Sequence, residues 1–194
     1  MLTLVPTRTA LVLIDVQKGT LGFTLAPHSA PDVTQTAVRL AQQCRQSGAT
    51  LVYVRVGFSD GFVDRPGGAI DTPMILPPDG LPKDWSDYAP EVAAIAPDLW
   101  ITKRQWSAFH GTELDLQLRR RGITHMILGG IATNFGVEST ARDGWQNNYT
   151  VVIAEDACSS MSDELHRFAI EKTLPRVSLV RGSAEIIAAL AAVS

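Results

Sequence analysis

The fold of this 194-residue chain is decided by the stretch from Met126 to Thr140, which reads MILGGIATNFGVEST. Its first residues form an apolar run typical of a buried strand, and the residues from about 135 onward predict a helix. The first turn of a helix has backbone N–H groups without intrahelical partners and the positive end of the helix dipole. The stretch therefore predicts a strand-to-helix turn that can hold a ligand around Gly136.

Short apolar runs alternate with amphipathic segments along the whole chain. The apolar runs are rich in Val and Ile without clean alternation, which indicates strands buried on both faces of a parallel sheet. Strands are predicted near 10–16, 50–56, 98–103, 124–130, 150–155 and 177–181, and helices near 31–47, 112–121, 135–147, 162–173 and 183–192. This order predicts a three-layer α/β/α sandwich around a six-stranded, mostly parallel, Rossmann-like sheet, with right-handed crossovers.

The composition is that of an ordinary globular chain with one core, so we expect a single domain over residues 1–194. Hydrophobic residues make up 45% and charged residues 19%, and the net charge is −3. This charge, without long charged runs, argues against nucleic acid or an anionic membrane as the main partner. The chain has no leader pattern, no apolar run of the roughly 18 residues of a membrane span, and two cysteines. We therefore expect a cytoplasmic protein.

Three polar or glycine positions fall at or just past the carboxyl ends of predicted strands. They are Asp15, Lys103 and Gly136. Ligands of open α/β sheets bind at that edge. An aspartate after a strand can also be a turn residue, and a lysine there can be solvated. We nevertheless expect the three to share a site, because all three strands end at one edge.

The motifs around these residues resemble those of the isochorismatase-like (cysteine hydrolase) superfamily. Amidases of that superfamily read roughly G-I-A-T-N-x-C-V-x-x-T-A-R at the nucleophile turn, and this chain has Gly136 in place of the cysteine. Residues 11–17, LVLIDVQ, resemble the catalytic aspartate segment, and residues 101–109, ITKRQWSAF, resemble the lysine segment. The resemblance extends over essentially all 194 residues. It is strongest to a bacterial isochorismatase-family hydrolase subgroup that shares the K-R-Q-W-x-A-F and T-N-x-G-V-E-S-T-A-R stretches.

The resemblance implies roles for the matched residues. In the amidases of the superfamily the aspartate takes the thiol proton, the lysine holds the ion cluster together, and backbone N–H groups receive the oxyanion. The positions that match are Asp15 and Lys103, with the amides of Ala132 and Gly136 as oxyanion donors. The resemblance also implies a cis peptide between Ile131 and Ala132, and a homo-oligomer, either a dimer or a tetramer.

Glycine at position 136 disfavours covalent acyl-enzyme chemistry. Cys158 follows a different predicted strand and Cys44 lies in a predicted helix, so both are interpreted as structural. Isochorismatases proper lack the cysteine as well, and their aspartate protonates a vinyl ether while water adds. Asp15 would then need a pKa well above about 4, which burial favours and the Lys103 ammonium opposes. Turnover of a small vinyl ether is one hypothesis. Binding of a small metabolite without turnover, and amide hydrolysis by Asp15-activated water, are the others.

Further residues in the motif segments are candidates for substrate binding. Phe23 and Trp106 could line an apolar pocket, but aromatic residues at such positions are often core residues. Ala132, Thr133 and Asn134 lie in the turn, and the last two could orient it through side-chain hydrogen bonds. The irregular residues 57–90 hold six of the eleven prolines and are typical of a flap over the site or a subunit contact.

The histidines predict no metal site. Nicotinamidases of the superfamily carry an Asp-x-His…His cluster beyond the second strand, and residues 55–61 here contain no histidine. The four histidines, His28, His110, His125 and His166, are interpreted as scattered. We therefore expect no metal and no cofactor.

Overall fold

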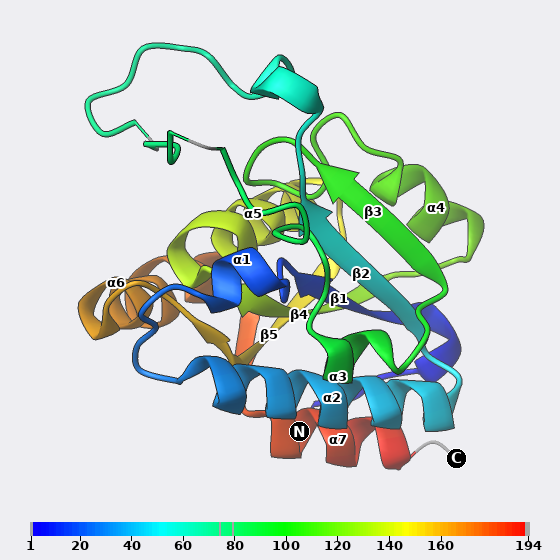
Figure 1. Cartoon of the computed structure of the whole chain (residues 1–194). Coiled ribbons are helices and arrows are strands. Elements are labelled where there is room, and N and C mark those ends of the chain that lie inside the picture. The colour runs from blue at the N-terminus through cyan, green and yellow to red at the C-terminus, as the bar shows by residue number, and fades with distance from the viewer. Residues whose placement is uncertain (1, 74, 79, 193–194) are drawn as a thin grey trace.

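The computed structural model describes residues 2–73, 75–78 and 80–192. A six-stranded sheet crosses the middle of the molecule with the strand order β3-β2-β1-β4-β5-β6, and all five pairings are parallel (Figure 1). Both halves of the sheet grow outward from β1 and β4, which is the doubly wound arrangement. The strands are β1 (Thr9–Ile14), β2 (Thr50–Val56), β3 (Leu99–Lys103), β4 (His125–Ile131), β5 (Thr150–Ser159) and β6 (Leu179–Arg181).

Helices cover both faces of the sheet and confirm the predicted three layers. Alternate residues of β1 enter different cores: Leu11 and Leu13 pack on one side, Val12 and Ile14 on the other. The first core is closed by α2 (Ala30–Ser47), α3 (Pro90–Ala93) and α7 (Ser183–Ala191). The second is closed by α4 (Leu114–Arg120), α5 (Glu138–Gln146) and the π-helical turn Ala169–Thr173, which continues α6 (Asp163–Phe168).

The longest helix, α2, has strong end signals in its sequence. Ser29 caps its first turn in a capping box with Asp32, and Gly48 ends it in the left-handed conformation at φ 79°. Within the described part of the chain, no helix is long and apolar enough to cross a membrane.

Three elements differ from the prediction near the carboxyl edge of the sheet. β5 continues to Ser159 instead of ending near 155, because its ladder with β4 shifts register and resumes at Gly130–Cys158 and Ile131–Ser159. The helix predicted from 135 begins as a π-helical turn, Thr133–Val137, and becomes α5 at Glu138. A short helix, α1 (Lys18–Leu21), also follows β1 unpredicted.

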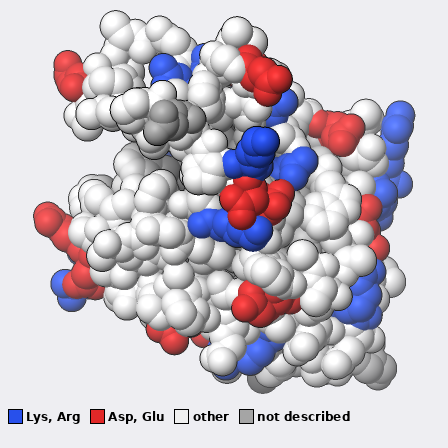
Figure 2. Space-filling model, viewed as in Figure 1, with Lys and Arg blue, Asp and Glu red and all other residues white. Residues whose placement is uncertain are grey.

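The described parts of the irregular segment 57–90 leave β2, project from the body and return beside α1 (Figure 1). A single helical turn, Asp60–Phe62, lies near its start. On its return the carbonyl of Trp85 accepts a hydrogen bond from the Gly19 backbone at 2.9 Å. A Cβ on Gly19 would lie 2.1 Å from the Trp85 indole nitrogen, so only glycine permits this contact. The space-filling view shows a hollow beneath the projecting part (Figure 2).

Candidate active site

A buried ion pair lies at the carboxyl edge of the sheet. Asp15 directly follows β1, and Lys103 ends β3, with β2 between the two strands. The Lys103 ammonium lies 2.6 Å from Asp15 Oδ2 and also donates to the carbonyl of Gln105 at 3.1 Å. Both side chains are buried. The two strand ends therefore bring together residues far apart in the chain, as the sequence predicts.

The backbone of Asp15 turns sharply to direct the carboxyl group. Its φ of 51° is in the left-handed region, where aspartate is one of the few tolerated side chains. The Asp15 amide donates to the Val54 carbonyl at 2.8 Å, and the Thr20 hydroxyl donates to the Asp15 carbonyl. The chain leaving β1 is thus held on both sides of the carboxylate.

Burial determines the protonation behaviour of Asp15. Desolvation raises the pKa of its carboxyl group above the ordinary value, and the Lys103 charge and hydrogen bond oppose that rise without cancelling it. Asp15 Oδ1 is buried and has no hydrogen-bond partner among the described residues. The group is therefore suited to hold or release a proton in a site that excludes most water.

The glycine turn lies directly against this carboxylate. Gly130, at φ 130°, brings β4 so close to β1 that a Cβ there would lie 1.9 Å from the Ile14 carbonyl oxygen. The following Ile131–Ala132 peptide is cis, as the family resemblance implied. A Cβ on Gly136 would lie 3.4 Å from Asp15 Oδ2 and 3.0 Å from Ile14 Cγ2. Asp15, Lys103 and Gly136 thus lie together at the carboxyl edge of the sheet.

Side-chain hydrogen bonds fasten the turn from several elements. Thr133 Oγ1 lies 2.9 Å from His166 Nδ1, and the Ser160 hydroxyl donates to Asn134 Oδ1 at 2.5 Å. The Thr140 hydroxyl donates to the Gly136 carbonyl at 2.7 Å and accepts from the Ala108 amide at 3.0 Å. The side chains of Thr133 and Asn134 therefore orient the turn. Ala132, just past the cis peptide, is buried and accepts from the Val137 amide at 3.2 Å.

The two predicted aromatic residues lie at the surface. Trp106 is exposed and packs against Phe135 with ring centroids 4.8 Å apart. Phe23, which follows α1, is exposed as well. The sequence did not predict this contact of Phe135, although Phe135 lies in the turn next to Gly136.

Neither cysteine is activated for nucleophilic attack. Cys44 lies on the core side of α2, and Cys158 lies on β5 opposite Gly130. Burial raises the pKa of each thiol to about 12. A thiol with that pKa is almost entirely protonated near neutral pH.

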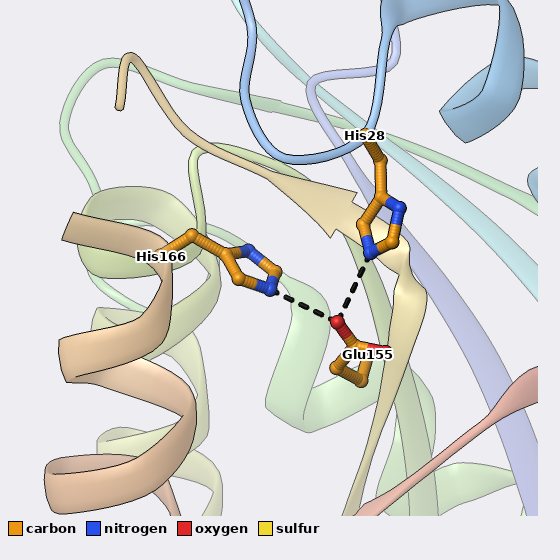
Figure 3. A group of neighbouring side chains, drawn as sticks. All are labelled: His28, Glu155 and His166. Carbon is orange, nitrogen blue, oxygen red and sulfur yellow. Dashed lines mark hydrogen bonds and ion pairs between the residues drawn. The ribbon is translucent and has the colours of Figure 1, made fainter. Parts of the chain in front are cut away.

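The interpretation of the histidines as scattered is wrong for two of them. His28 and His166 converge on Glu155, and each Nε2 lies about 3 Å from the same carboxylate oxygen, at 3.0 and 3.1 Å (Figure 3). Hydrogen bonds with His166 and, to a smaller extent, with His28 lower the pKa of Glu155 to about 2, although its burial alone would raise that pKa. No local sequence pattern predicts this cluster, because it depends on the extension of β5 and on contacts between residues far apart in the chain.

The chain and its fold have relatives among known proteins. The family model described as the isochorismatase domain matches residues 9–185. The chain belongs to the isochorismatase family. Within this family of hydrolases, it is 46% identical over 190 residues to YecD of Escherichia coli O157:H7, covering 98% of this chain and all of that protein.

Two further isochorismatase relatives place the chain within the family. An isochorismatase family protein from Burkholderia thailandensis has a solved structure that matches with a TM-score of 0.91 at 40% identity, over 97% of this chain and 98% of that one. The ureidoacrylate amidohydrolase RutB of Yersinia enterocolitica is 34% identical, over 76% of this chain and 74% of that protein. The family fold predicted from the sequence motifs is therefore confirmed.

Proposed function

We propose that this isochorismatase-family protein hydrolyses a small metabolite without a cysteine nucleophile, with Asp15 as general acid and base and Lys103 as its partner. The observation that carries the proposal is the position of Gly136 beside the carboxylate, where a side chain would begin 3.4 Å from Asp15 Oδ2. The family's nucleophile position thus contributes only backbone, and the reactive group next to it is a buried carboxyl.

Hydrolysis of a vinyl ether fits this group. A raised pKa keeps part of the Asp15 carboxyl protonated, so it can donate its proton to the terminal carbon of the double bond. The cation formed at the ether carbon is then attacked by water. The resulting carboxylate takes a proton from that water, and the hemiketal breaks down to a ketone and an alcohol. Lys103, 2.6 Å from Oδ2, orients the carboxyl and stabilises the charge that it acquires.

Amide hydrolysis is the second candidate, and the name of one relative favours it. RutB, a ureidoacrylate amidohydrolase, is 34% identical to this chain. Here ionised Asp15 activates a water molecule directly, and the amides of Ala132 and Gly136 receive the oxyanion. The third candidate is a protein that binds a small metabolite without turnover. In each case we expect a homo-oligomer that acts in the cytoplasm.

A turnover screen separates these candidates. The purified protein, Asp15→Asn and Gly136→Cys are assayed against a panel of vinyl ethers and a panel of amides and ureides. Asp98→Asn is the matched control, because Asp98 directly precedes β3 at the sheet edge opposite to Lys103. Thermal melting of each variant shows that it is folded.

The expected result is vinyl-ether turnover by the wild type and by Asp98→Asn, with a loss of about a hundredfold or more in Asp15→Asn. Wild-type turnover of amides alone would favour the second candidate. A wild type that is silent on both panels, with amidase activity gained by Gly136→Cys, would refute turnover and leave the binding protein.

A further inference from the structure

Three side chains from distant parts of the chain converge behind the glycine turn. His28 lies in the segment between α1 and α2, Glu155 lies in β5, and His166 lies in α6. Figure 3 shows both imidazole rings directed at one carboxylate oxygen, with Nε2–Oε1 distances of 3.0 Å for His28 and 3.1 Å for His166. The three ligand atoms all lie within 4.8 Å of one another.

These distances suit a shared metal ion. Zinc binds imidazole nitrogen and carboxylate oxygen at about 2.0–2.2 Å, so two ligands of a tetrahedral site lie about 3.3 Å apart. The nitrogen–oxygen distances in the cluster are close to that value. The rings of His28 and His166 are nearly perpendicular, at 84°, with centroids 5.6 Å apart, so they do not stack and their nitrogens can face one ion.

The surroundings of His166 resemble the outer shell of a metal site. Its Nδ1 lies 2.9 Å from Thr133 Oγ1, which leaves Nε2 for the ion. A metal-bound histidine usually has its other ring nitrogen fixed by such a partner. His166 is buried, whereas the side chains of His28 and Glu155 are 29% and 34% exposed. One side of the cluster is thus open for an ion to enter and for water to complete its coordination.

We propose that His28, Glu155 and His166 bind one divalent transition-metal ion, with Zn²⁺ as the best fit. Two imidazoles and one carboxylate are a ligand set that zinc takes with a fourth position open to water. The ion fastens β5, α6 and the segment before α2 to one another, and His166 extends this connection to Thr133 in the turn. The site differs from the region after β2, residues 55–61, that matches the metal cluster of nicotinamidases, and it does not depend on the proposed hydrolase activity.

Metal binding by the full-length protein tests the proposal without any substrate. The protein is stripped with a chelator, dialysed, and titrated with Zn²⁺ by calorimetry at pH 7.5. Co²⁺ is added in parallel, because its visible absorption reports nitrogen and oxygen ligands. His28→Ala removes a partly exposed ligand and should leave the fold intact. His110→Ala is the matched control, since His110 lies outside the cluster.

The expected result is one Zn²⁺ per chain for the wild type and for His110→Ala. His28→Ala and Glu155→Gln should each weaken binding by a hundredfold or so, and Thr133→Val by about tenfold through the lost outer-shell hydrogen bond. Zinc should also raise the melting temperature of the wild type more than that of His28→Ala. Absence of binding at micromolar Zn²⁺ would overturn the proposal and leave a hydrogen-bonded cluster, as would equal binding by the wild type and His28→Ala.

Discussion

At the scale of single residues, Gly130 and Gly136 flank the same turn but lack side chains for different reasons. Gly130 has a φ of 130°, and a Cβ there would lie 1.9 Å from the Ile14 carbonyl oxygen. The contacts of a Cβ at Gly136 are only tight, the shortest being 3.0 Å to the Ile14 side chain, and its φ is not positive. The fold therefore requires glycine at 130, whereas at 136 the missing side chain concerns the chemistry of the site.

Substituting the two glycines with alanine should show this difference. We expect Gly130→Ala to lower the free energy of unfolding by about 3 kcal/mol or more, because both the backbone conformation and the contact with Ile14 oppose a side chain. Gly136→Ala should change it by about 1 kcal/mol or less, since gained helix propensity offsets the contact with Ile14. Urea denaturation measures both values, and similar losses in the two variants would contradict the distinction.

The pH dependence of turnover should report the role of Asp15. Burial raises the pKa of Asp15. If Asp15 acts as the general acid, its carboxyl group is protonated below that pKa and loses its proton as the pH rises through it. We therefore expect kcat/KM for a vinyl ether to fall on the alkaline side. Lys103→Met removes the charge that lowers the pKa, so it should move this fall to higher pH.

The control for that profile is another lysine. Lys18→Met removes an exposed lysine that pairs with Asp84, and it should leave the position of the alkaline fall unchanged. Activity that instead disappears as the pH is lowered would indicate that Asp15 works as a base, as in the amide route.

At the scale of elements, the sequence was most informative where strands are continuous and apolar. The strand predicted at 50–56 has those bounds in the structure. β1, which leads to Asp15, and β3, which ends at Lys103, both end within two residues of the prediction. The prediction for β5 stopped near 155, because Glu155 and Asp156 interrupt its apolar run. Those carboxylates are accommodated by His28, His166 and Ser183, partners that no local pattern reveals.

The candidate site, too, could be predicted from the sequence only in part. The pair of Asp15 and Lys103 could be predicted, because parallel strands end at one edge and the motifs around both residues match a family. Their separation of 2.6 Å and the resulting pKa depend on burial, which only the packed structure defines. The cluster around Glu155 could not be predicted, since His28 lies 127 residues away in the chain.

The start of the projecting segment depends on one carboxylate. Asp64 accepts hydrogen bonds from the Ser59 amide at 2.9 Å and hydroxyl at 2.8 Å, and from Arg104 Nε at 2.5 Å. These hydrogen bonds lower the pKa of Asp64 to about 2, and the bond from the Ser59 amide has the largest effect. Their contribution to local stability is therefore present above about pH 4 and lost as the pH falls toward 2.

We expect Asp64→Asn to reproduce that loss at neutral pH. Hydrogen exchange followed by mass spectrometry should show faster exchange in residues 57–66 of the variant, with little change in the sheet. Asp60→Asn, in the helical turn Asp60–Phe62 that precedes Asp64, is the control. If the two variants exchange alike, Asp64 does not anchor the segment.

At the scale of the whole molecule, an exposed apolar stripe follows α6. Leu165 and Phe168 lie on α6, Met161 just precedes the helix, and all three side chains are exposed. Such surfaces are typical of contacts between protein chains. We expect a homo-oligomer, a dimer or a tetramer, in sedimentation equilibrium.

A charge on this stripe should weaken that association. Phe168→Asp should shift the equilibrium toward the monomer, whereas Trp145→Asp changes an exposed aromatic residue of α5 and is the control. A wild type that sediments as a monomer at all concentrations would contradict the expectation.

Because β1 lies in the middle of the sheet, the sheet around it is completed in two stages as the chain is synthesised. β1 leaves the ribosome first, but both of its neighbours, β2 and β4, are made later, and the partner of Asp15 lies 88 residues further along. The half of the sheet from β3 to β1 can pair before the later strands leave the ribosome, so the charged pair can form before the glycine turn is available to pack against it. A nascent chain at that stage exposes the edge of β1 that β4 later covers, and an uncovered strand edge of this kind can pair with other chains.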